Sequence, residues 1–453
     1  MKPHVELTVR PGTRPRGLED APYWEDIIRD KARAVEPTEP QLAAVLRRHR
    51  RAAWATHAYA PRGGGWSRDE IASGLDRIYR LVLQVNGDIP EALIRDIRLL
   101  PYVESAHAGR VAAAPMPEPR AAAMGAGIGQ DSRDAIHLPE AQGHSTGDPG
   151  VVVAVLDTGV WLDHPEYADV VLPGRDVVDI LDGAASFFGD FLDADDDPTD
   201  PVGHGTHVAG IIAARGLHMP VGVVPRCRIL PVRVLGAMRQ GERRVGAGLV
   251  DNINVGIKWA VDQGAQVINM SLGIRHTAGG LPHAEVIEYA RRQGVTVVAA
   301  AGNDGREELY YPGALPYVIA VGAVDGEGSV APYSTWGMQV SLVAPGTNIY
   351  SSYLEGGYAF STGTSHATPF VSGAVAMLRS VARARGVALG DAQGKHVLKH
   401  TADKVGRAFK DRKAGFGQLN LLDAVRLLEH KLEQAPAHPR PRPRAHRQER
   451  TLN

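Results

Sequence analysis

The stretch VVVAVLDTGV, Val151–Val160, decides the fold. It opens with an uninterrupted apolar run rich in β-branched side chains, which is typical of a strand buried on both faces. Three similar runs follow, QVINMSL from Gln266 to Leu272, VTVVAAA from Val295 to Ala301 and YVIAVGAV from Tyr317 to Val324. Strands of this kind belong to parallel sheets covered by helices, so we expect an α/β fold with a mostly parallel sheet.

Helical stretches separate these runs. Residues Leu249–Gln263 and Ala284–Gln293 are expected to be helices, and each is followed by a glycine, Gly264 or Gly294. Glycine tolerates the left-handed conformation that ends many helices. In an open sheet of this type, functional sites gather at the carboxyl ends of the strands.

Composition excludes several classes of protein. The chain has 453 residues, a formal net charge of −1 and a single cysteine, so it has no internal disulfide scaffold and no overall field that attracts nucleic acid or membranes. No uncharged apolar run approaches the ~20 residues of a membrane helix. Lys2, Glu6 and Arg10 occupy the place where a signal peptide needs apolar residues. These features predict a cytoplasmic protein without nucleic-acid or membrane partners.

Composition also divides the chain into four parts. Residues 1–115 form a small α+β segment, 116–130 a linker, 131–431 the α/β core, and 432–453 a basic tail rich in proline and arginine. The stretch from Ala112 to Gly129 is small and proline-rich, which is typical of a flexible connector. For the tail, disorder and docking onto an acidic partner both remain open.

The N-terminal segment shows its own secondary-structure signals. Ser67 and Glu70 have the spacing of a capping box, which predicts a helix start. Residues Arg77–Val85 alternate as a half-buried strand does, and a helix is expected after Pro90. A second strand-like stretch runs from about Tyr102 to Val111.

Three residues at element edges have complementary chemistry. Asp157 directly follows the first buried strand, His204 heads an apolar helix, and Ser365 lies in the glycine-flanked turn GTSHATP. A serine hydroxyl becomes a good nucleophile when an imidazole takes its proton and a carboxylate orients that imidazole. These residue types indicate nucleophilic acyl transfer.

The order of these motifs resembles the subtilisin family of serine peptidases. The resemblance rests on the boxes DTG, HGTHVAG and GTSxA, together with NMSLG, AAGN, VAPGTNI and GFGQLNLLDAV, and it covers about 129–431. It implies a three-layer fold and a serine endopeptidase that cuts protein or peptide substrates and needs no cofactor for the chemistry. It also implies Ser365 as nucleophile, His204 as general base, Asp157 as its orienting partner, and Asn303 as an oxyanion donor.

The resemblance also suggests substrate-binding residues. Three consecutive residues are expected to line the cleft: Ser271, Leu272 and Gly273. The loop after Asn303 should border the pocket for the residue before the scissile bond. There Glu307 and Glu308 would favour a basic side chain, while Tyr310 could narrow the pocket toward small ones; we favour the basic preference.

Two histidines need separate consideration. His204 and His207 could be two zinc ligands on one helix face, but no third ligand at usable spacing and no HExxH motif accompany them, so we interpret His207 as structural. The residue after the nucleophile is usually methionine in the subtilisin family and is His366 here. We expect His366 to have a polar packing role near the leaving-group side.

An acidic loop precedes His204. Four of its carboxylates are candidate ligands of a structural Ca²⁺ ion: Asp193, Asp195, Asp197 and Asp200. Oxygen ligands in a flexible loop suit calcium, and a solvated acidic loop is the alternative.

The strand–helix–strand stretch Arg77–Val111 weakly resembles the propeptide of the subtilisin family. We therefore expect the N-terminal region to act as an intramolecular inhibitor that is removed at the connector, so that the chain is a zymogen. A permanent domain gated by a partner is the alternative. For the whole chain, the alternative to an enzyme is a catalytically idle scaffold used for protein binding.

Overall fold

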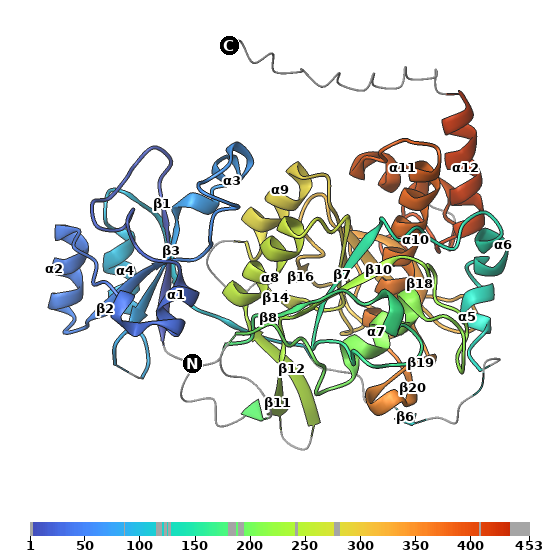
Figure 1. Cartoon of the computed structure of the whole chain (residues 1–453), viewed down its shortest axis with the longest axis horizontal. Helices are drawn as coiled ribbons and strands as arrows, with labels where there is room; N and C mark the ends of the chain where they lie inside the picture. The colour runs from blue at the N-terminus through green and yellow to red at the C-terminus, as the bar shows by residue number, and fades with distance from the viewer. Residues whose placement is uncertain are drawn as a thin grey trace, which may run out of the picture.

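The chain folds into a small N-terminal domain packed against a larger α/β domain (Figure 1). The computed structural model describes residues 3–85, 87–114, 120–121, 125, 128–179, 187–188, 194–240, 243–275, 281–406 and 409–434. The predicted tail from residue 435 onward lies outside this range, as does most of the predicted linker.

A seven-stranded sheet forms the centre of the larger domain. Its strands, in spatial order, are β18 (Val340–Pro345), β17 (Ile319–Val324), β15 (Thr296–Ala300), β13 (Val267–Met270), β7 (Val152–Asp157), β10 (Arg228–Arg233) and β8 (Arg175–Asp176). All neighbouring pairs are parallel. The predicted parallel sheet is therefore confirmed, and the four apolar runs supply four of its strands.

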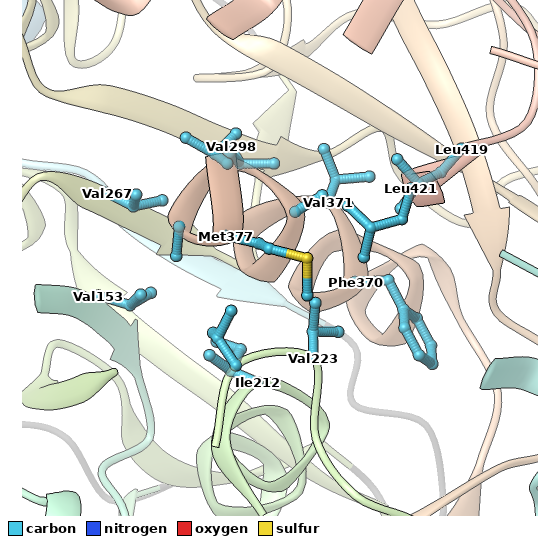
Figure 2. Packing of buried hydrophobic residues seen from close by; sticks show 14 of the residues in the cluster. Val153, Ile212, Val223, Val267, Val298, Phe370, Val371, Met377, Leu419 and Leu421 are labelled. Carbon is cyan, nitrogen blue, oxygen red and sulfur yellow. The ribbon is translucent and has the colours of Figure 1, made fainter. Parts of the chain in front are cut away.

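Helices cover both faces of this sheet, which gives three layers (Figure 1). Helices α7 (His204–Ala213) and α10 (Thr364–Ala384) pack on one face, and α8 (Val250–Asp262) and α9 (Ala284–Arg292) belong to the core on the other. Figure 2 shows Met377 of α10 among Val153, Val267 and Ile212, in the hydrophobic core on the side of the sheet that α7 and α10 cover. Close packing of this core fixes the first turns of α7 and α10 at one edge of the sheet.

The predicted helices α8 and α9 are confirmed within one or two residues. Gly264 and Gly294, which follow them, have φ angles of 84° and 72°, as expected for left-handed residues that end a helix. The remaining helices of this domain are α5 (Asp131–Asp134), α6 (Leu138–Gln142), α11 (Asp391–Thr401) and α12 (Leu421–Gln434).

The N-terminal domain is an antiparallel sheet with helices packed on it. Its strands, in spatial order, are β2 (Ala53–His57), β3 (Ile78–Leu83), β1 (His4–Val9) and β4 (Val103–Ala108). Its helices are α1 (Trp24–Arg29), α2 (Pro40–Arg48), α3 (Arg68–Ala72) and α4 (Glu91–Arg98). The capping box of Ser67 and Glu70 starts α3 as predicted.

Part of the connector is strand, which the sequence did not indicate. Residues Val111–Ala114 form β5, which joins β12 (Arg243–Leu249), β11 (Gly236–Gln240) and β9 (Phe187–Phe188) in a sheet. Residues Arg120–Ala121 form β6 beside the hairpin of β19 (Ile349–Ser352) and β20 (Tyr358–Ser361). Strand addition uses backbone hydrogen bonds, so these alanine-rich segments need no apolar period to pair.

No helix within the described part of the chain combines the length and apolar character that a membrane crossing requires.

Candidate active site

Asp157 and His204 meet at the carboxyl edge of the sheet. Asp157 ends β7, and His204 begins α7. The Nδ1 atom of His204 lies 2.7 Å from Oδ1 of Asp157, and both side chains are buried. Because a carboxylate accepts hydrogen bonds, Nδ1 carries the hydrogen and Nε2 is the basic nitrogen of the neutral ring.

Two opposing effects set the pKa of His204. Burial lowers it, while the negative charge of Asp157 and the hydrogen bond to Asp157 raise it, and the net result lies above the ordinary value of 6.5. The imidazole of His204 is therefore a stronger base than a histidine in water.

Asp200 holds the first turn of α7 in place. Its Oδ1 accepts from the backbone N–H groups of Val202 and Gly203, both at 2.8 Å. Its Oδ2 accepts from the N–H of Thr206 at 2.9 Å and from the Thr206 hydroxyl at 2.7 Å. These four bonds fill the acceptor sites of a carboxylate. The predicted role of Asp200 as a calcium ligand therefore does not fit, because its oxygens position the helix that carries His204.

The other predicted calcium ligands lie in the preceding loop. Oδ1 of Asp195 accepts from the N–H of Asp197, whose own Oδ1 accepts from the N–H and hydroxyl of Thr199. Asp193 lies outside the described residues. Among the residues that are described, no three His, Cys, Asp or Glu side chains converge as a metal site.

Ser365 lies in the first turn of α10, next to the segment after β13. Its hydroxyl donates to the carbonyl of Ser271 at 3.0 Å, and the hydroxyl of Ser271 donates to the carbonyl of Ser365 at 2.7 Å. Asn269 donates to the hydroxyl of Ser271 at 3.0 Å and accepts from Ser372 at 2.8 Å. This network fixes the backbone of Ser365. The hydroxyl hydrogen of Ser365 points to the carbonyl of Ser271 and must turn away from it before a base can take it.

Asn303 is oriented by the residue before Ser365. Its Oδ1 accepts from the N–H of Thr364 at 2.8 Å and from the Thr364 hydroxyl at 3.0 Å. Since these bonds fix the oxygen end of the amide, the NH₂ end is turned away from Thr364. Asn303 is exposed, so its NH₂ group can donate to a substrate beside the helix start.

His207 and His366 form a buried pair behind His204. Nε2 of His207 lies 3.1 Å from the carbonyls of Ile349 and Ala359, and burial lowers the pKa of His207 to about 3. The ring centroid of His366 lies 4.4 Å from that of His207 and 5.3 Å from that of His204. Burial holds the pKa of His366 well below 6.5. Burial therefore favours the neutral form of both rings, and neither ring nitrogen of His366 has a hydrogen-bond partner within the described ranges.

The predicted substrate-binding residues lie on two adjoining segments. Ser271, Leu272 and Gly273 link β13 to β14 (Ile274–Arg275), which pairs with β16 (Tyr310–Tyr311). The hydroxyl of Tyr310 donates to Asp304 at 2.9 Å.

The two glutamates of the pocket loop have local counter-charges. Glu307 is paired with Arg412, and Glu308 lies 3.5 Å from Arg306 and 3.9 Å from Arg275.

Sequence reasoning missed two contributors to this site, the anchoring of Asn303 by Thr364 and the helix-capping role of Asp200. It also missed the edge of β12 that pairs with β5. The sequence marks that edge only by two glycines, Gly246 and Gly248.

The comparison with known families settles the relationship. The profile of the subtilase family, peptidase S8, matches residues 148–417, which is more than half of the chain. The chain belongs to the subtilase family. This subtilase is a serine endopeptidase with polypeptide substrates, as its named serine proteinase relatives support.

Individual relatives differ in how much of this subtilase they match. A thermophilic serine proteinase of Bacillus sp. (strain AK1) is 38% identical over 284 residues, or 62% of each chain. Thermitase of Thermoactinomyces vulgaris is 36% identical over 60% of this chain and 87% of its own. An intracellular serine protease of Paenibacillus polymyxa is 38% identical over 52% of this chain and 68% of its own.

Solved structures support the fold. The prenylagaramide maturation protease PagA has a TM-score of 0.52 and 32% identity, covering 64% of this chain and 98% of its own. A lanthipeptide protease has a TM-score of 0.55 and 25% identity, covering 66% and 93%.

Proposed function

We propose that Ser365, His204 and Asp157 form the catalytic triad of this endopeptidase. The hydrogen bond of 2.7 Å between His204 and Asp157 carries the proposal, because it leaves Nε2 of His204 as the base at the edge where Ser365 lies. The chemistry needs the side chains and backbone of this chain, the substrate and one water molecule.

The reaction proceeds in two stages. Nε2 of His204 takes the proton of Ser365 as Oγ attacks the substrate carbonyl, and the resulting imidazolium gives that proton to the departing amine as the C–N bond breaks. The acyl group remains on Oγ. A water molecule then gives a proton to His204 and attacks the ester, and His204 passes this proton to Oγ as the acyl–Oγ bond breaks, which releases the acid and restores the hydroxyl of Ser365.

We propose that Asn303 and the backbone N–H of Ser365 stabilise the oxyanion of each tetrahedral intermediate. The bonds from Thr364 support this role, because they orient the amide before substrate arrives and no reorganisation is needed in the transition state. The N-terminus of α10 adds a favourable dipole.

We also propose the cleft and pocket residues named from the sequence. Ser271, Leu272 and Gly273 are proposed to pair with the substrate backbone. Glu307 and Glu308 are proposed to favour a basic residue before the scissile bond, although their arginine partners reduce the free negative charge there. Profiling with a peptide library tests this preference, and a profile without Arg or Lys enrichment would exclude it.

The N-terminal region is proposed as an intramolecular inhibitor. It packs on α8 and α9 through contacts across the two domains: His4 to Asp251 at 2.6 Å, Arg80 to Asn252 at 3.0 Å, Glu70 to Lys258 at 2.8 Å and Asp69 to Gln293 at 2.7 Å. Beyond it, β5 occupies the edge of β12 from Gly246 to Leu249. A strand on that edge competes with an extended substrate for the same backbone groups.

Two further proposals concern the cellular location of the protein and a bound metal ion. An intracellular setting is supported by the single cysteine, Cys227, which is buried, and by the printed name of the Paenibacillus polymyxa relative; cell fractionation tests it. A Ca²⁺ ion is proposed at the loop of Asp193, Asp195 and Asp197, without Asp200, where it would stabilise the loop and take no part in catalysis.

Labelling with a fluorophosphonate probe separates the enzyme from an idle scaffold. The native chain is expected to be labelled and Ser365→Ala is not, while both unfold at similar temperatures. A native chain that binds proteins but never reacts with the probe supports the scaffold.

Time-resolved mass spectrometry of the native chain and of Ser365→Ala tests the zymogen. Cleavage near the connector in the native chain alone is expected. A native chain that is fully active and never cut there would instead indicate a permanent domain.

A further inference from the structure

Two described segments of the connector pair with strands of the catalytic domain. Strand β5 pairs with β12, and strand β6 pairs with β20, which ends four residues before Ser365. Because β5 precedes β6 in the chain, any bond cut between them leaves β5 on the acyl side and β6 on the leaving-group side. In the proposed zymogen, where the connector is the segment that is cut, the edge of β20 therefore holds polypeptide that follows the scissile bond.

One side chain of β6 is held specifically on that edge. Arg120 lies opposite Phe360 in the strand register. Its Nη2 donates to Oδ1 of Asn348 at 2.7 Å, and its guanidinium carbon lies 5.9 Å from the centroid of the Phe360 ring. A neutral amide oxygen and an aromatic ring together suit a planar cation.

The two residues that hold Arg120 are themselves fixed by the catalytic domain. Asn348 has a φ angle of 53°, a left-handed conformation that asparagine tolerates better than most residues. Its N–H donates to the hydroxyl of Thr362 at 2.9 Å. The Phe360 ring packs against Tyr350 with centroids 5.2 Å apart. These restraints lie outside β6, so they remain when the connector leaves the cleft.

We propose that Asn348 and Phe360 form a subsite for an arginine side chain on the leaving-group side of the substrate. The proposal rests on the proposed peptidase function and names a feature of its substrates. Lysine is expected to bind less well, because its ammonium group cannot both lie flat on the ring and direct an N–H to Oδ1. A glutamate at the same position would place a carboxylate, which has no hydrogen to donate, against Oδ1 of Asn348.

A competition assay tests the subsite directly. Peptides with the sequence of residues 109–124 carry Arg, Lys, Ala or Glu at the position of Arg120. Their inhibition constants are measured against hydrolysis of a labelled casein by the full-length chain, with active sites counted by fluorophosphonate. Because a cut and an uncut peptide both compete, the assay does not depend on which bond is cleaved. We expect Arg to bind about five- to tenfold better than Ala.

Variants of Asn348 sharpen the assay. Asn348→Gly keeps the left-handed backbone, because glycine adopts it freely, and should reduce the preference for Arg over Ala to about twofold or less. Asn348→Asp should increase the preference for Arg, because it supplies a full negative charge. Glu355→Gly is the matched control, since Glu355 is exposed, has a φ angle of 56° and lies at the far end of the same hairpin.

Equal inhibition by the Arg and Ala peptides on an active enzyme would overturn the subsite. A chain that neither cuts casein nor reacts with the probe indicates failure of the proposed function instead. Amide hydrogen exchange then still tests whether Asn348 binds Arg120. It is measured in the full-length Ser365→Ala chain, where a further substitution, Arg120→Ala or Asn348→Gly, should speed exchange of the β20 amides. Unchanged exchange in both would also overturn the subsite.

Discussion

The catalytic centre and the surface that holds the N-terminal domain are built from different interactions. At the centre, the hydrogen bonds of His204, Ser365 and Asn303 come from the α/β domain itself. At the domain contact, the bonds join separate domains and include the buried pairs His4–Asp251 and Glu70–Lys258 as well as hydrogen bonds between charged and neutral side chains.

The order of the proposed catalytic residues and the access of substrate to them therefore depend on different sets of contacts. The proposed catalytic residues are ordered by contacts within the α/β domain, so in the proposed zymogen they would stay ordered when the N-terminal domain leaves. A buried ion pair is a weak net source of stability, because each charge gains hydration on separation. The N-terminal domain can therefore fit specifically and still be released.

The largest expected effect on kcat comes from a substitution within the proposed catalytic triad that leaves the domain contact unchanged. Asp157→Asn removes the charge that stabilises the imidazolium and disturbs the tautomer of His204, so we expect kcat to fall about 10⁴-fold. Steady-state kinetics on a peptide substrate measures it, with the exposed Asp163→Asn as control. A fall of less than about tenfold would show that Asp157 does not orient the base.

The pH dependence of the native enzyme sharpens the same point. His204 must be neutral to accept a proton, and its pKa lies above 6.5. Activity is therefore lost as pH falls through a midpoint above 6.5. In Asp157→Asn this midpoint should move to lower pH, because the raising charge is gone. An unchanged midpoint would assign the titration to another group.

Removal of the oxyanion donor should have the next largest effect. Asn303→Ala leaves the triad intact and removes one donor, so kcat should fall about 10²–10³-fold with KM nearly unchanged. Thr364→Val, which removes only the hydroxyl bonded to Oδ1 of Asn303, should cost less. A large rise in KM at constant kcat in Asn303→Ala would indicate substrate binding instead.

A change at the domain contact should act on access and leave the chemistry intact. Asp251→Asn removes the buried carboxylate charge that faces His4 and Arg80, so release of the N-terminal domain should become about ten- to hundredfold easier. The lag before full activity of the native chain measures it. Asp26→Asn, at a half-exposed pair with Arg33, is the control and should change the lag little. An unchanged lag in Asp251→Asn would contradict inhibition through this contact.

Acid should weaken the same contact. Burial would raise the pKa of Asp251, but His4 and Arg80 outweigh it and hold that pKa below 3.8. The stabilisation is therefore present above pH 3.8 and is lost as the pH falls further below that value.

Calcium should have the smallest effect. If the loop of Asp195 and Asp197 binds the ion, a chelator should lower the unfolding temperature by a few degrees at most in the native chain. The double variant Asp195→Asn with Asp197→Asn should lose this response. A native chain whose unfolding temperature ignores both chelator and added calcium would rule the ion out.

The sequence predicted the strands of the central sheet better than the contacts around the proposed catalytic residues. Continuous apolar runs such as Val151–Leu156 are direct consequences of burial on two faces, so the strands could be predicted. The strand pairing of Val111–Ala114 could not, because it depends on a partner edge more than a hundred residues away. Asp200 was misread for a related reason: a carboxylate that caps a helix and one that binds calcium look alike until their partners are known.

A crystal structure of the enzyme after reaction with a fluorophosphonate tests the central claim most directly. The phosphorus should be bonded to Oγ of Ser365, with Nε2 of His204 beside it. One phosphoryl oxygen should lie about 2.7–3.1 Å from both Nδ2 of Asn303 and the N–H of Ser365. An adduct on another residue, or an oxygen directed away from Asn303, would contradict the assignment of the centre.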